Sequence, residues 1–103
     1  MALTIVGIGA SAGGLEAVVE LLGALPAATG MAYIVVQHLD PRHESLLSEI
    51  LAKKTAIPVS VALSGEIVQP DHVYVIPPDV TLTVLAGRIQ LSPRPNAPNG
   101  LFP

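Results

Sequence analysis

Cysteine and tryptophan are both absent from this sequence of 103 residues, and only 3% of its residues are aromatic. The absence of cysteine excludes disulfides and thiolate metal sites, and it is compatible with a reducing cytosol. Half of the residues are apolar, so the material for a core is present, but that core must consist mainly of Val, Ile, Leu and Ala. The length predicts one small domain and no more.

Basic residues are also scarce. Five Lys and Arg stand against eight Asp and Glu, which gives a formal charge of −3, and their scatter argues against a nucleic-acid-binding surface. The first basic residue is Arg42. The apolar N-terminal stretch is therefore not expected to be a signal peptide, although Ala10-Ser11-Ala12 resembles a cleavage site. No apolar run approaches the roughly 18 residues that a membrane span needs.

The first half of the chain reads as strand, helix, strand, helix. Residues 3–9 are a β-branched apolar run, which predicts a buried strand. From Leu15 the apolar residues recur at helical spacing until Pro26, and residues 31–38 predict a second buried strand. Asp40-Pro41 is a candidate cap for the next helix, whose apolar face consists of Leu46, Leu47, Ile50 and Leu51.

The second half predicts strands at 57–62 and 72–77, followed by a hairpin over 81–92 at an edge of the sheet. The proline-rich residues 93–103 show no periodicity and predict a linker or loose end. The whole pattern indicates an α/β fold with a parallel sheet in residues 1–92. In such sheets functional residues gather at the carboxyl ends of the strands.

The turn after the first strand, GIGASAGG at residues 7–14, fits two patterns. It matches the G-x-G-x-x-G/A dinucleotide fingerprint, and it matches the G-x-S-x-G nucleophile elbow centred on Ser11. Both patterns expect a strand before the turn and a helix after it. The turn alone therefore leaves phosphate binding and nucleophilic catalysis open, beside a third interpretation in which a small residue merely permits a tight turn.

A histidine at the next strand end favours catalysis. Ser11 follows the first predicted strand and His38 closes the second, so neighbouring strands would bring both side chains to one sheet edge. An imidazole there can take the serine proton and return it to the leaving group. The N–H of Ala12, next after the serine, is the natural donor to a developing oxyanion.

The phosphate interpretation requires an acidic residue about 20 positions after the glycines, at the end of the second strand. Gln37-His38 occupies that strand end, and the nearest acid, Asp40, lies 31 residues beyond Gly9 and is expected to cap a helix. His38 could also be a histidine satisfied under a loop. A metal site made of His38, Asp40 and His43 fits no standard spacing. The remaining histidine, His72, and the tyrosines Tyr33 and Tyr74 are interpreted as structural residues.

Three motifs in order, GIGASAGGLEA, VVQHLDP and PDHVYVIPP, resemble the catalytic domain of the chemotaxis protein-glutamate methylesterases over residues 3–92. Ala12 and the GGLEA continuation are similar to the version fused to a chemotaxis methyltransferase. The resemblance implies an incomplete, N-terminal half of a doubly wound Rossmann-like domain, ending in the hairpin. It implies that Ser11 is the nucleophile, His38 the general base and Ala12 an oxyanion-hole donor.

The same resemblance implies hydrolysis of γ-glutamyl methyl esters, and deamidation of glutamines, on the cytoplasmic helices of chemoreceptors. It implies no cofactor, a cytoplasmic location and, as a further partner, a chemotaxis methyltransferase domain. The family commonly carries a preceding receiver domain, which is not expected here because Met1 lies two residues before the first strand.

One departure concerns the triad. The family's aspartate lies in a G-M-G-x-D-G segment that this sequence does not contain, and Asp79 is a poor stand-in. The isolated chain is therefore expected to be nearly inactive, because loss of the orienting aspartate costs about 10⁴ in turnover. A sheet covered on one face only is expected to self-associate. The alternative to an enzyme is a non-catalytic module that binds a receptor or a methyltransferase.

Overall fold

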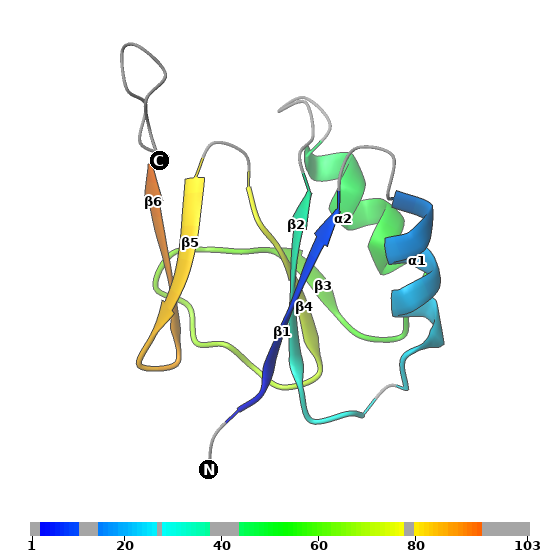
Figure 1. The fold of residues 1–103 in the computed structure, drawn as a ribbon, viewed down its shortest axis with the longest axis horizontal. Helices are drawn as coiled ribbons and strands as arrows, with labels where there is room; N and C mark the ends of the chain where they lie inside the picture. The colour runs from blue at the N-terminus through cyan, green and yellow to red at the C-terminus, as the bar shows by residue number, and fades with distance from the viewer. Residues whose placement is uncertain (1–2, 11–14, 27, 38–43, 78–79, 94–103) are drawn as a thin grey trace.

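The computed structural model describes residues 3–10, 15–26, 28–37, 44–77 and 80–93. These residues form three layers, with helices on one side, a parallel sheet in the middle and a β-hairpin on the other side (Figure 1). This is the predicted α/β class with a C-terminal hairpin. The parallel sheet and its helices make the fold Rossmann-like.

The parallel sheet has four strands, β1 (Ile5–Ala10), β2 (Ala32–Gln37), β3 (Val59–Val61) and β4 (His72–Val75), in the order β1-β2-β4-β3. All three pairings are parallel. The strands are rich in Val, Ile and Tyr, which pack well on a pleated surface. The predicted neighbourhood of the first two strands is confirmed, and β1 lies at one end of the sheet.

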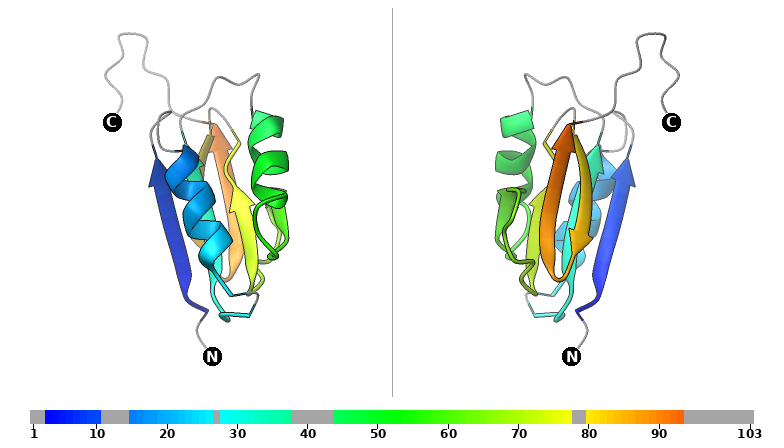
Figure 2. Two further views of the ribbon diagram at one scale, coloured as in Figure 1. Left: turned by 90° about the vertical axis from the view of Figure 1, so that its right-hand side faces the viewer. Right: turned by 90° about the vertical axis from the view of Figure 1, so that its left-hand side faces the viewer.

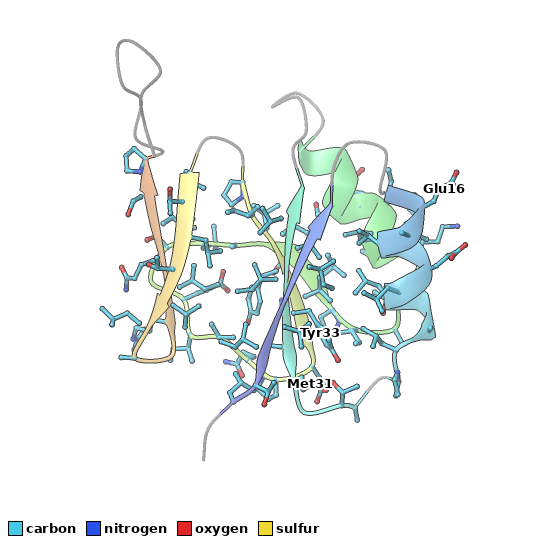
Figure 3. All side chains as sticks on the ribbon, viewed as in Figure 1. Glu16, Met31 and Tyr33 are labelled. Carbon is cyan, nitrogen blue, oxygen red and sulfur yellow. The ribbon has the colours of Figure 1, made fainter. Side chains whose placement is uncertain are left out.

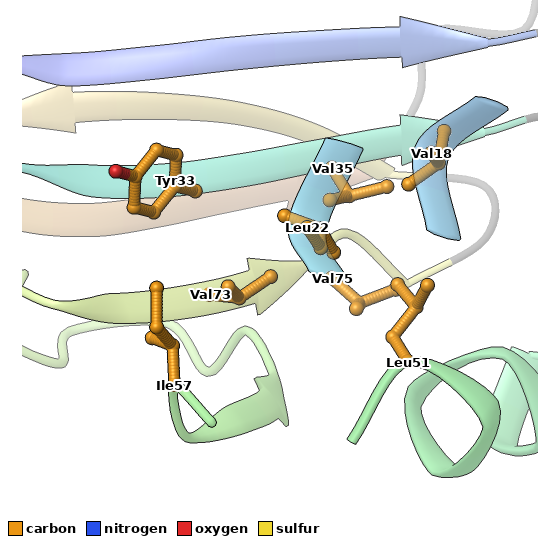
Figure 4. Close-up of a cluster of buried hydrophobic side chains, with 8 residues drawn as sticks. All are labelled: Val18, Leu22, Tyr33, Val35, Leu51, Ile57, Val73 and Val75. Atoms are coloured by element: carbon orange, nitrogen blue, oxygen red, sulfur yellow. The ribbon is translucent and has the colours of Figure 1, made fainter. Parts of the chain in front are cut away.

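Both described helices, α1 (Leu15–Ala24) and α2 (Glu44–Ala52), cover the same face of this sheet (Figures 1 and 2). Their apolar residues have the helical spacing expected from the sequence, and they bury Val18, Leu22 and Leu51 against the strands. Figure 4 shows this cluster, which the strands and a loop complete with Tyr33, Val35, Ile57, Val73 and Val75. Neither helix is long and apolar enough to cross a membrane.

The hairpin joins β5 (Val80–Leu85) to β6 (Arg88–Pro93) through Ala86 and Gly87, whose φ angles are 54° and 78°. Two consecutive positive φ angles are typical of a type I′ turn, which matches the twist of an antiparallel pair. The hairpin itself is confirmed, but its expected place is not. It forms a separate two-stranded sheet rather than an edge of the parallel sheet.

The hairpin packs against the face of the parallel sheet opposite the helices. The cluster between the two layers contains the fully buried Ile89 and Tyr74, together with Ala32, Ile34, Ala62 and Val68. The expectation of a sheet covered on one face only is therefore wrong over β2 and β4. Apolar and polar residues alternate along the hairpin sequence, and its apolar residues cover this face of the sheet.

A carboxylate ties the amino ends of β2 and β4 together. Asp71, directly before β4, accepts hydrogen bonds at Oδ1 from the backbone N–H groups of Thr29 (2.7 Å) and Gly30 (2.8 Å). Its own N–H donates to the carbonyl of Met31 at 2.8 Å. Beyond it, the hydroxyls of Thr29 and Tyr33 lie 2.6 Å apart, and Figure 3 shows Met31 and Tyr33 at this end of β2.

Replacing Asp71 by alanine should lower the free energy of unfolding by about 2–3 kcal/mol, because its carboxylate loses two backbone hydrogen bonds and a longer one from the Thr29 hydroxyl. Asp71 also has a φ of 55°, a conformation that Asn tolerates better than Ala. Asp71→Asn keeps the side-chain oxygen and also tolerates this φ, so it should lower the free energy of unfolding by less than half as much. Urea denaturation checks this, and equal losses for both variants would contradict it.

Candidate active site

The carboxyl ends of β1 and β2 lie side by side. The two strands are paired from Ile5 and Ala32 to their last residues, where Ala10 is the register partner of Gln37. In sequence, Ser11 follows Ala10 and His38 follows Gln37. Ser11, Ala12 and His38 themselves lie outside the described residues. The structure therefore gives the backbone positions that precede the nucleophile and base predicted from the sequence, and not their side chains.

The elements around this turn are those that both glycine patterns require. β1 ends at Ala10 and α1 begins at Leu15, so a strand precedes the glycine-rich segment and a helix follows it, while residues 11–14 lie outside the described residues. The first N–H groups of a helix have no partner within it and make its N-terminus favourable for negative charge. Such a terminus can stabilise either an oxyanion or a phosphate. The strand before the glycine-rich segment and the helix after it are confirmed, and they do not distinguish an oxyanion site from a phosphate site.

The glycines of β1 leave open space on one face of the strand. Gly7 and Gly9 are exposed, and a Cβ added at either position would meet no atom within 4 Å. Val36, the register partner of Gly9, keeps 42% of its surface exposed. The hairpin therefore does not cover this part of the sheet. β1 ends here at Ala10, the residue before Ser11. Gly9 lies within β1 and does not have a positive φ.

The structure contains a second serine–histidine pair that the sequence analysis missed. Ser60 on β3 and His72 on β4 place Oγ and Nε2 2.9 Å apart. The ring of His72 also stacks on Tyr74, with centroids 4.4 Å apart. His72 begins its strand, so this pair lies at the amino end of the sheet, away from the carboxyl ends where parallel sheets carry their sites. The predicted structural role of His72 fits these contacts.

Both tyrosines are core residues with satisfied hydroxyls, as predicted. Tyr33 keeps 2% of its surface exposed and Tyr74 none. The Tyr74 hydroxyl accepts a hydrogen bond from the N–H of Gln69 at 2.8 Å. Burial raises the pKa of Tyr74, and nearby Glu66 adds to the rise, while the Gln69 hydrogen bond opposes it. A phenol kept neutral in this way is a packing residue rather than an acid or base at neutral pH.

Three further candidates, Asp40, His43 and Asp79, lie outside the described residues. The metal interpretation, which combines Asp40 and His43 with His38, therefore has no geometry to support it. The same holds for Asp79 as a substitute for an orienting aspartate. The phosphate interpretation is weakened, because β2 ends at Gln37 and its last residue is not acidic.

Comparisons with known proteins agree on one family. The sequence profile described as CheB methylesterase matches residues 6–101. A relative from Cupriavidus metallidurans, a protein-glutamate methylesterase/protein-glutamine glutaminase, is 40% identical over 88% of this chain and 27% of its own length. One from Myxococcus xanthus with the same name is 38% identical over 96% of this chain and 28% of its own length.

A solved structure gives the same result for the fold. The CheB methylesterase catalytic domain of Thermotoga maritima superposes with a TM-score of 0.82 and 29% sequence identity, over 96% of this chain and 55% of that domain. The chain thus spans about a quarter of the length of the curated relatives, and about half of a catalytic domain. The resemblance noted in the sequence is confirmed over nearly all of this chain.

Proposed function

Because this chain belongs to the CheB methylesterase family, we propose that it carries the nucleophile and general base of a protein-glutamate methylesterase. Ser11 is the nucleophile in this proposal, His38 is the base, and the N–H of Ala12 donates to the oxyanion. The proposed substrates are γ-glutamyl methyl esters, and glutamine amides, on the cytoplasmic helices of chemoreceptors. The chain would accordingly act in the cytoplasm.

The pairing of Ala10 with Gln37 carries this proposal. Register partners in a parallel pair lie about 4.8 Å apart across the strands, and the next residue along each chain is the serine or the histidine. A shift of a few residues in this register would separate the two side chains by a further ~3.3 Å per residue. The observed register therefore supports a serine–histidine pair within hydrogen-bonding reach.

The proposed chemistry runs through an acyl-enzyme. The Ser11 hydroxyl oxygen attacks the ester carbonyl carbon while its proton passes to the His38 imidazole. The carbonyl oxygen becomes an oxyanion, and the Ala12 N–H, just before α1, stabilises it. When the tetrahedral intermediate collapses, the C–O bond to the methoxy group breaks. The imidazolium protonates the leaving group, and methanol departs.

Water then completes the cycle. The neutral imidazole takes a proton from water, whose oxygen attacks the acyl carbon, and the returning proton releases the Ser11 hydroxyl and a glutamate side chain. With glutamine as the substrate the first leaving group is ammonia, and the second half of the cycle is the same. Every step uses side chains and backbone N–H groups, so the proposal calls for no cofactor.

The orienting aspartate is the part that this sequence does not match. G-M-G-x-D-G occurs nowhere in the 103 residues, and an imidazole without its aspartate loses its preferred tautomer and orientation. We therefore expect residues 1–92 to act as one part of a catalytic domain, with 93–103 as a linker. The same observation favours a second candidate function, a non-catalytic module that binds a receptor or a methyltransferase domain.

Fluorophosphonate labelling followed by peptide mass spectrometry separates the two functions. The samples are this chain and a chimaera that joins residues 1–92 to the remaining part of the Thermotoga maritima domain. The catalytic proposal predicts slow labelling of Ser11 in the chain and fast labelling in the chimaera, abolished in both by Ser11→Ala. Ser60→Ala is the matched control, because Ser60 also contacts a histidine, and it should leave labelling unchanged. An unlabelled chimaera would favour the non-catalytic module.

A further inference from the structure

We draw no further inference here: the strongest candidate, a surface patch on the hairpin layer where the exposed side chains of Ile67 and Leu85 lie on either side of Arg88 across neighbouring strands, carries no proposal because nothing in the structure shows what covers it.

Discussion

Replacing His38 by glutamine should lower the turnover of a completed catalytic domain by about 10⁴–10⁶. The serine hydroxyl is a poor nucleophile at neutral pH, and glutamine can hydrogen-bond to it without taking its proton. The change is made in the chimaera of residues 1–92 with the rest of the Thermotoga maritima domain. Methanol release from a methyl-esterified receptor fragment measures the rate.

Ser11→Ala and the double variant show whether the two residues act as a unit. Nucleophile and base in such sites are strongly non-additive, so Ser11→Ala/His38→Gln should be no slower than either single variant. His72→Gln is the matched control, because it alters the other serine–histidine pair, at the amino end of the sheet. It should leave turnover within about threefold, because His72 lies at the end of the sheet opposite the proposed site. Equal losses from His38→Gln and His72→Gln would remove His38 from the mechanism.

The sequence predicted the elements well because each one has a strong local signal. The β-branched run before the glycines, the helical spacing from Leu15 and the turn at Ala86-Gly87 all identify elements that the structure contains. The pairing of β1 with β2 could also be predicted from local periodicity, since a short helical crossover favours neighbouring parallel strands. The strand ends that precede Ser11 and His38 follow from the same signals.

Long-range packing could not be predicted from these local signals. The alternating apolar residues of 81–92 fit an edge of the main sheet as well as a separate layer on its face, and only contacts such as Ile89 against Tyr74 distinguish them. The position of β4 between β2 and β3 has the same origin, and the pairing of β3 with β4 brings Ser60 into contact with His72. A spacing of 12 residues gives no hint of that contact, because it depends on the strand register.

Replacing Leu22 by alanine should lower the free energy of unfolding by about 3–5 kcal/mol. Leu22 is fully buried and lies in the cluster where α1 meets Val35 and Val75 of the sheet (Figure 4). The truncation removes apolar surface from the core and leaves a cavity that a close-packed interior fills only in part. Because small domains are stable by only about 5–15 kcal/mol, this one change should place the chain close to its unfolding threshold.

The neighbouring residue provides a matched control within the same helix. Leu21→Ala makes the same chemical change one position away, but Leu21 keeps 46% of its surface exposed, so the loss should stay below about 1 kcal/mol. Urea denaturation compares the two variants at one protein concentration, since any self-association would make apparent stability depend on concentration. Similar losses for both variants would mean that α1 does not pack on the sheet through the face that carries Leu22. The N-terminus of α1, on which the proposed oxyanion site depends, would then not be held against the sheet by that face.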